Sequence, residues 1–400
     1  MRALADRPRC VDRIKPFMWN GNAKIVTGIR RCGKSSVLKL VSESIEGDCN
    51  AVFINMELAE NHDIRGWRDL LSRIDGSIDP SRRNALFIDE VQNVDGWELA
   101  IRDVLARGAC DVYITGSNSN LLSSEYATHL GGRFNEIRML PLSLSECADF
   151  QREFGGEEAT LERFLRIGGF PALWRHPMGA EASIQTVSDL VEVSIAGDII
   201  RRYDVRNAPL LRDLLRCALS YIGKYVSANN MYNALKSSGA KVSPDTVYEY
   251  LGHLESANIL IRANAFDVRG KRVLTSKYKY YASDLGIKHA LLGYRPEDSP
   301  GHMENAIFTE LLGRGYRVHV GECGGREIDF VAERGDERVY VQACLSMASE
   351  ETSERELGSL EAIGDSFPKY VVLMDPGAHA GVTEKGVRCV SLSRFLSSEL

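Results

Sequence analysis

A glycine-rich turn between an apolar run and a helical pattern constrains this 400-residue chain most. Residues 28–35 read Gly-Ile-Arg-Arg-Cys-Gly-Lys-Ser, directly after Ile25-Val26-Thr27. Glycines let successive backbone N–H groups of such a loop point at a phosphate, and the helix that follows adds its dipole. The spacing is that of a P-loop. The residues expected to bind a nucleotide are Gly28, Ile29, Arg30, Arg31, Cys32, Gly33, Lys34, Ser35 and Ser36.

Two side chains of the loop and two carboxylates downstream form a predicted hydrolytic set. Lys34 is expected to reach the β and γ phosphates, and the Ser35 hydroxyl to bind Mg²⁺. Residues 85–90 read Ala-Leu-Phe-Ile-Asp-Glu, a pattern typical of a buried parallel strand that ends at a metal. Asp89 would hold Mg²⁺ and Glu90 would polarise the attacking water. The alternative, a solvated strand end, is disfavoured by the P-loop upstream.

A third apolar run, residues 111–118, ends in small polar groups. Thr115, Ser117 or Asn118 could position the lytic water, the role called sensor 1 in AAA-type ATPases, and we predict Asn118 as the catalytic residue. The alternative is an Asn-containing turn that caps the next helix. Arg133 follows that helix, and in ring-forming AAA ATPases an arginine of this region enters the neighbouring subunit's site. As a lone loop arginine it is equally compatible with a surface charge.

Composition limits the surroundings of this site. Hydrophobic residues make up 44% and charged residues 26%, which is ordinary for a globular protein, and 400 residues suggest two or three domains. No apolar stretch approaches the ~20 residues that a membrane helix needs, so a cytoplasmic protein without a membrane partner is expected. Nine scattered cysteines form no C-x-x-C pair, which disfavours a zinc site or a disulfide framework. The net charge of −6 requires any nucleic-acid binding to come from a local patch.

The fold class predicted for the chain is α/β. Strand-like and helical segments alternate over residues 20–145 and predict a doubly wound parallel sheet with ligands at its carboxyl edge. The expected strands are 24–27, 51–56, 85–89, 111–115 and 134–139. The predicted domains are an AAA-type P-loop domain over 1–145, a helical lid or connector over 146–205, a winged helix-turn-helix over 206–282 and a restriction-endonuclease-like α/β domain over 283–400.

Three helical patterns and two strand-like runs carry the winged-helix prediction. These segments are Leu210–Ile222, Ser227–Ser237, a helix from Ser243-Pro244-Asp245, Ile259–Ala265 and Arg272–Tyr281. A basic stretch interleaved with Tyr278, Tyr280 and Tyr281 could follow a phosphate backbone. Its members are Arg269, Lys271, Arg272, Lys277 and Lys279. Asp245 and Glu249 on the candidate recognition helix would repel DNA, so a protein-binding role is the alternative.

The last 120 residues show the layout of a metal-dependent nuclease with essential positions replaced. Glu304 is expected to open a helix, and Asp329 lies on a strand-like run. The next run should carry E-x-K but reads Gln342-Ala343-Cys344, so a carboxylate and the water-activating lysine are missing. We expect a nuclease-like scaffold without nuclease activity, in which Glu304, Asp329, Gln342 and Cys344 form a degenerate site.

Taken together, the chain resembles a prokaryotic family of AAA-type ATPases that couple a P-loop domain to a C-terminal domain of unknown function. Related archaeal ATPases share the order P-loop, winged helix, nuclease-like domain. The segments that carry the resemblance are 28–35, 86–92, 113–118, 131–134, 198–203, 279–292, 327–331, 340–342 and 368–372. The resemblance implies binding and hydrolysis of ATP. Cys32 departs from the small hydroxyl residue common at this loop position, which suggests sensitivity to oxidation.

Three functions from different classes agree with these patterns. The first is a Mg²⁺-dependent ATPase whose nucleotide state moves the winged helix and the C-terminal domain against a partner, either an unknown protein or DNA. The second is an ATP-dependent DNA nuclease, which Gln342 and Cys344 oppose. The third is a nucleotide-gated assembly protein. A homo-oligomer is expected because Arg133 would act in a neighbouring subunit.

Overall fold

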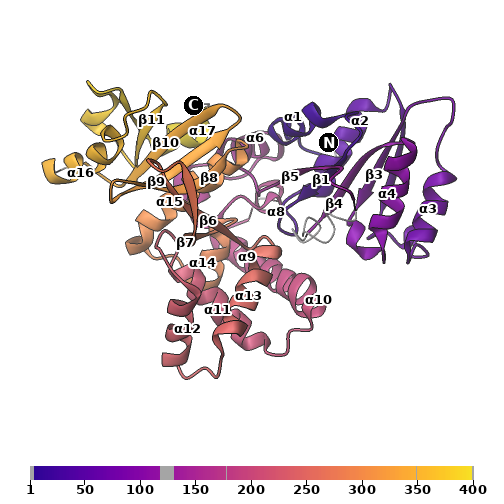
Figure 1. Cartoon of the computed structure of the whole chain (residues 1–400), viewed down its shortest axis with the longest axis horizontal. Helices are drawn as coiled ribbons and strands as arrows, with labels where there is room; N and C mark the ends of the chain where they lie inside the picture. The colour runs from indigo at the N-terminus through magenta and orange to yellow at the C-terminus, as the bar shows by residue number, and fades with distance from the viewer. Residues whose placement is uncertain (1–3, 118–129, 177, 348, 399–400) are drawn as a thin grey trace. The chain divides into compact units, whose positions relative to one another are not determined.

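The computed structural model describes residues 4–117, 130–176, 178–347 and 349–398. They divide into two units, residues 1–140 with 256–258 and residues 141–255 with 259–400. Figure 1 labels many of the helices and strands of both units. Each unit is built around its own β-sheet.

The first unit contains a five-stranded parallel sheet in the order β2-β3-β4-β1-β5. This confirms the predicted P-loop type of parallel sheet. Its strands are β1 (Ala23–Thr27), β2 (Asn50–Asn55), β3 (Asn84–Asp89), β4 (Asp111–Gly116) and β5 (Phe134–Arg138). Its helices are α1 (Pro8–Ile14), η1 (Lys15–Phe17), α2 (Lys34–Ile45), η2 (Ala59–Asn61), α3 (Trp67–Asp75), η3 (Val91–Asn93) and α4 (Trp97–Arg107).

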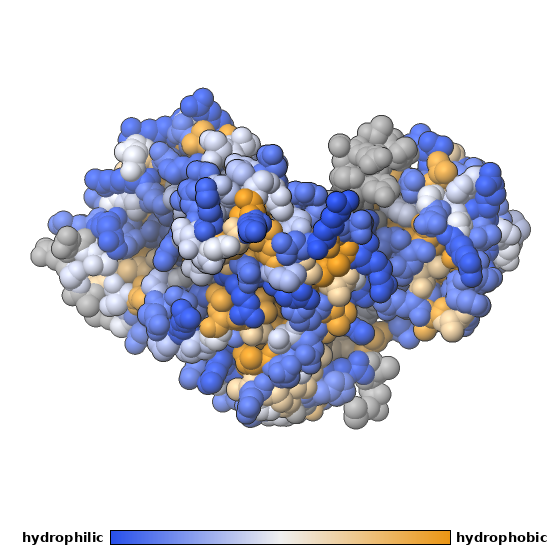
Figure 2. Space-filling view, turned by 90° about the horizontal axis from the view of Figure 1, so that it is seen from below, coloured by the Kyte–Doolittle hydropathy of each residue, from blue (hydrophilic) through white to orange (hydrophobic). Residues whose placement is uncertain are grey.

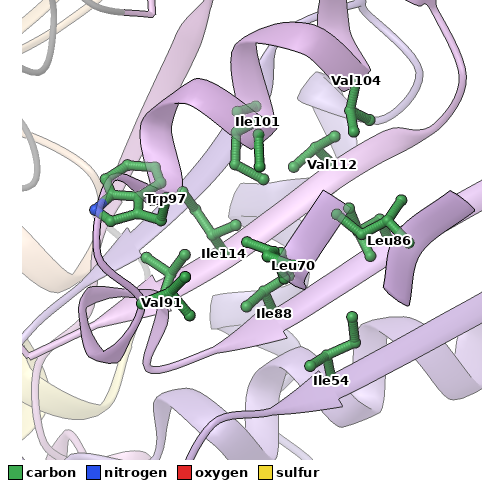
Figure 3. Close-up of a cluster of buried hydrophobic side chains, with 14 of the residues drawn as sticks. Ile54, Leu70, Leu86, Ile88, Val91, Trp97, Ile101, Val104, Val112 and Ile114 are labelled. Carbon is green, nitrogen blue, oxygen red and sulfur yellow. The ribbon is translucent and has the colours of Figure 1, made fainter. Parts of the chain in front are cut away.

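Helices cover the strands of this sheet, as a parallel sheet requires. Apolar side chains of α3 and α4, among them Leu70 and Ile101, pack on Leu86 and Ile88 of β3 (Figure 3). The intervening Phe87 points to the opposite face, where its ring stacks on Tyr113 at 4.6 Å. All residues of β3 and β4 are buried. The continuous apolar runs that predicted these strands therefore reflect burial on both faces.

The second unit begins with helices and continues into an eight-stranded mixed sheet. Its helices are α6 (Leu144–Phe154), α7 (Leu161–Ile167), α8 (Pro171–Arg175), α9 (Ala180–Ser194), the π-helical η5 (Ile195–Ile200), α10 (Arg201–Tyr203), α11 (Ala208–Ser220), α12 (Ala228–Ser237), α13 (Pro244–Ser256), α14 (Leu285–Leu292), η6 (Pro296–Asp298), α15 (Ser299–Gly313), α16 (Glu350–Glu361), η7 (Gly377–His379) and α17 (Leu392–Ser397). Its strands are β6 (Leu260–Asp267), β7 (Arg272–Ala282), β8 (Arg317–Cys323), β9 (Arg326–Arg334), β10 (Glu337–Cys344), β11 (Lys369–Leu373), β12 (Gly381–Val382) and β13 (Val387–Ser391).

The hairpin β6–β7 does not stand alone as a wing. The strand order is β12-β13-β11-β10-β9-β8-β6-β7, and Ala265–Asp267 of β6 pair in parallel with Val320–Glu322 of β8. The helices α11, α12 and α13 precede the hairpin in the predicted order. An independent winged helix is therefore not confirmed, because its hairpin is the edge of the C-terminal sheet.

The surface in Figure 2 is mainly hydrophilic and is interrupted by several hydrophobic areas. Large apolar side chains that are exposed in the second unit include Val193 on α9 and Tyr248 on α13. Among the helices of the described residues, none combines the length and the apolar character that crossing a bilayer requires.

Candidate functional site

The carboxyl ends of β1, β3 and β4 lie at one edge of the first unit's sheet. Thr27 of β1 pairs with Gly116 of β4, and Ile88 of β3 pairs with Ile114 of β4. Strand β4 thus separates the strand of the P-loop from the strand that ends in Asp89. The predicted phosphate loop and the predicted acidic pair come together at this edge, as expected for a ligand site in a parallel sheet.

Glycine is required at both ends of the phosphate loop. A Cβ on Gly28 would lie 2.2 Å from the Met139 carbonyl oxygen, so no other residue fits there without a shift of the backbone. Gly33 has φ 101° and directly precedes α2, which begins at Lys34. The first N–H groups of α2 have no partners within the helix and are available to an anion. The loop therefore has the geometry of a phosphate cradle.

Lys34 links the loop to the acidic pair. Its Nζ donates to the carbonyl oxygens of Gly28 at 3.1 Å and of Ile29 at 3.3 Å. The same Nζ lies 3.8 Å from Oε1 of Glu90, and both side chains are buried. The ammonium therefore lies between the phosphate loop and the predicted water-activating carboxylate.

Thr115 ties the two carboxylate residues together. Its Oγ1 donates to Asp89 Oδ1 at 2.5 Å and accepts from the Glu90 backbone N–H at 2.9 Å. Glu90 has φ 57°, an uncommon backbone conformation for a residue other than glycine, of a kind that clusters at functional sites. The Gln92 amide donates to Glu90 Oε2. Of the three sensor candidates, Thr115 thus contacts both Asp89 and the Glu90 backbone, and Asn118 lies outside the described residues.

The donor set suits Mg²⁺. Asp89 is fully buried, and its Oδ2 has no hydrogen-bond partner among the residues that the structure covers. Ser35 is exposed in the first turn of α2. A carboxylate oxygen and a hydroxyl are hard ligands of the kind that Mg²⁺ uses together with nucleotide phosphates. The two predicted metal ligands are thus free to serve as such.

Two features of the loop were not expected from the sequence. Arg7 is buried, and its guanidinium donates to the Cys32 carbonyl at 2.8 Å and to the Leu140 carbonyl at 3.3 Å, which fixes the loop from the N-terminal segment. No local motif marks this arginine. Burial raises the pKa of the Cys32 thiol, so the reactive thiolate is disfavoured, contrary to the expected sensitivity to oxidation.

The remaining residues of the predicted first-unit site occupy different positions. Ile29 is buried, Arg31 is exposed, and Arg30 lies 3.6 Å from Glu57. Arg133 is exposed, and its carbonyl accepts from the Ala23 N–H at the amino edge of the sheet. This is the edge opposite the P-loop, so Arg133 is not part of its own subunit's site.

The predicted basic stretch divides into exposed and buried side chains. Arg269, Lys271 and Arg272 are exposed, whereas Lys277 pairs with Glu322 at 2.7 Å. The prediction that Lys279 contacts nucleic acid is wrong: its side chain is 2% exposed and paired with carboxylates. The interleaved tyrosines Tyr278, Tyr280 and Tyr281 are buried as well. The last five residues of this strand are all buried, which places these side chains in the interior rather than on a binding surface.

Two of the predicted nuclease-like residues, Glu304 and Asp329, lie at that lysine. Lys279 Nζ lies 3.1 Å from Glu304 Oε2 and 4.0 Å from Asp329 Oδ1. Glu304 lies within α15 rather than at its start. Gln342 Oε1 accepts from the Asp329 N–H at 3.2 Å, while Cys344 is buried and its Sγ donates to the Ser346 carbonyl. An ammonium group is therefore present at these acids, supplied by β7 and not by the E-x-K position.

Comparison with known proteins gives two domain matches. Residues 20–148 match the AAA domain, and residues 158–298 match a domain of unknown function (DUF8612). A solved Walker-type ATPase of Pyrococcus abyssi has the same fold over 72% of this chain and 96% of its own, with a TM-score of 0.52 and 17% identity. The AAA match, with this fold, indicates an ATP-binding domain.

Two relatives match almost the whole chain. An uncharacterized protein of Methanocaldococcus jannaschii is 27% identical over 90% of this chain and 82% of its own length. An uncharacterized protein of Haemophilus influenzae is 30% identical over 93% of this chain and 94% of its own length. The chain therefore belongs to the family of this Haemophilus influenzae protein, and it carries an AAA domain followed by a domain of unknown function.

Proposed function

We propose that this protein binds and hydrolyses ATP with Mg²⁺, and that its nucleotide state drives a conformational switch of the second unit against a partner. The AAA domain and the convergence of the P-loop with two carboxylates support the ATPase part. The second unit, residues 141–255 with 259–400, is the part that the nucleotide state would move in this proposal. DNA is one candidate partner, through the exposed Arg269, Lys271 and Arg272.

Each residue of the site has a distinct task in this proposal. The loop from Gly28 to Gly33 binds the phosphates through backbone N–H groups, and Lys34 adds positive charge where charge develops in the transition state. Glu90 accepts the proton of the attacking water, and Thr115 holds the Asp89 carboxylate and the Glu90 backbone in position. Mg²⁺, bound through Asp89 and Ser35, would neutralise phosphate charge.

The observation that carries this proposal is the unequal environment of the two Asp89 oxygens. Oδ1 is held by Thr115, while Oδ2 is buried and unpartnered within the described part of the chain. A buried carboxylate oxygen without a partner is costly, and a cation would remove that cost. The position therefore favours a metal ligand over a structural residue.

Metal removal tests this directly. We expect Mg²⁺-dependent phosphate release from ATP by the full chain, and its loss in EDTA. Asp89→Asn should lower kcat by roughly 100-fold, since the amide removes the ligand charge. Asp48→Asn is the matched control, because Asp48 is an exposed aspartate of the same unit. Phosphate release that persists in EDTA would contradict the proposed metal dependence.

Arg133 tests whether subunits complete one another's sites. We expect the specific activity of the wild type to rise with protein concentration, and Arg133→Ala to lower kcat by about 10³-fold only where subunits associate. Arg65→Ala, an exposed arginine of the same unit, is the control. Native mass spectrometry with and without ATP reports the subunit number. An Arg133→Ala variant with full activity in the associated state would remove this role.

A further inference from the structure

One lysine of the second unit is enclosed by acidic side chains. Lys279 Nζ lies 2.6 Å from Glu327 Oε1, 3.1 Å from Glu304 Oε2 and 4.0 Å from Asp329 Oδ1. The Lys279 side chain is 2% exposed, and those of Asp329 and Glu304 are 9% and 15% exposed. The carboxylates come from α15 and β9, and the ammonium comes from the edge strand β7.

Hydrogen bonds orient the acids of this cluster. Asp329 Oδ2 accepts from the Ala343 N–H at 2.8 Å, which leaves Oδ1 as the oxygen nearer the ammonium. Tyr281 OH donates to Glu304 Oε2 at 3.1 Å, on the oxygen that also receives Lys279. Glu304 and Asp329 are therefore held in place beside the ammonium, while the third acid, Glu327, is 41% exposed.

The electrostatics agree with an ammonium that stays charged. Burial alone would lower the pKa of Lys279, but the charges of Glu304, Asp329 and Glu327 more than offset it and raise that pKa. Burial raises the pKa of Glu304 and that of Asp329, and the charge of Lys279 acts on both in the opposite direction. A lysine ammonium is a compact point charge with three donors, so it can substitute for a metal ion among carboxylates.

We propose that Lys279 takes the place of a divalent cation in this acid-lined centre. The wild-type chain then binds no Mg²⁺ or Mn²⁺ there, and removal of the ammonium group turns the centre into a site for such a cation. Among the described residues, no group of three His, Cys, Asp or Glu side chains is arranged to hold a metal ion. A nuclease that uses a metal ion together with a lysine would need both cations in this centre, which in this proposal holds the ammonium alone.

Metal-dependent stability of the full chain tests this proposal. All proteins carry Asp89→Asn, so that the P-loop carboxylate contributes no metal binding, and no nucleotide is added. The variants are Lys279→Ala, Lys279→Ala with Asp329→Asn, and Lys277→Ala as the control lysine two residues earlier on the same strand. Thermal unfolding is measured in EDTA and in MnCl₂. Terbium luminescence excited through tyrosine gives a second readout, since Tyr281 contacts Glu304.

We expect Mn²⁺ at about 100 times its Kd to raise the Tm of Lys279→Ala by roughly 5 °C. The Tm should not rise with Mn²⁺ in three proteins: the Asp89→Asn parent that retains Lys279, the Lys277→Ala control and the Lys279→Ala/Asp329→Asn variant. Terbium luminescence should follow the same order. If Lys279→Ala does not fold in EDTA, the proposal requires Mn²⁺ to restore folding.

Two results would overturn the proposal. One is a Lys279→Ala variant that responds to Mn²⁺ no more than Lys277→Ala, or that Mn²⁺ fails to refold. The other is stoichiometric Mn²⁺ binding by the protein that retains Lys279, abolished by Asp329→Asn, which would show that ammonium and metal occupy the centre together.

Discussion

Glu90→Gln should bind ATP with the affinity of the wild type and release phosphate at least about 100-fold more slowly. The amide has nearly the size of the carboxylate but cannot accept the proton of the attacking water. The backbone of Glu90 is fixed by Thr115, so the substitution leaves the geometry of the site in place. Nucleotide affinity and kcat, measured separately, give the expected split. Glu60→Gln, an exposed glutamate of the same unit, is the control.

Normal turnover by Glu90→Gln would show that another group activates the water. If turnover is suppressed, the variant holds ATP and can be used to trap a partner. A pull-down with this variant and ATP, analysed for both protein and nucleic acid, separates the candidate partners. Capture of DNA that is lost when Arg269 and Arg272 are replaced would favour the exposed basic hairpin as its contact.

Lys34→Ala should abolish ATP binding rather than slow hydrolysis. The ammonium bridges the Gly28 and Ile29 carbonyls and lies 3.8 Å from Glu90, so its removal deletes the charge that attracts the phosphates. The remaining buried Glu90 would also repel them. Wild-type protein should gain about 2.7 kcal/mol of unfolding free energy from ATP at 100 times its Kd, and Lys34→Ala should gain none.

Lys39→Ala is the matched control for Lys34, because Lys39 is exposed on the same helix. This control should be stabilised by ATP as the wild type is. A Lys34→Ala variant that keeps the wild-type Kd would contradict the assignment of the loop as the phosphate site. Loss of binding in both variants would point instead to damage of α2.

The sheet of the first unit was predictable because its signals are local. The continuous apolar run of β3 and the glycine spacing of the P-loop each depend on a few neighbouring residues. The contact of Thr115 with Asp89 required knowing that β4 lies beside β3, since the sequence alone also offered Ser117 and Asn118 and led us to predict Asn118. Arg7 acts on a loop 25 residues away and leaves no pattern in the sequence.

The position of Lys279 could not be read from its own segment. Basic residues alternating with tyrosines resemble an exposed nucleic-acid-binding strand, and the same alternation suits a strand whose end is buried on both faces. Its partners Glu304 and Glu327 lie 25 and 48 residues later in the chain. The sequence placed Glu304 and Asp329 in one candidate site, but it did not include Glu327 and it assigned the lysine to a different surface.

The pairing of β6 with β8 limits how this protein can be shortened. A chain ending at residue 282 would keep the helices before the hairpin and the pairing of β6 with β7, but it would leave the backbone groups of Ala265–Asp267 that face β8 without partners, an edge that favours aggregation. Such a chain would also lack Glu304, Glu327 and Asp329, the acidic partners of Lys279. Poor behaviour of such a fragment would reflect a broken sheet rather than a lost function, so deletion studies should keep residues 259–400 together.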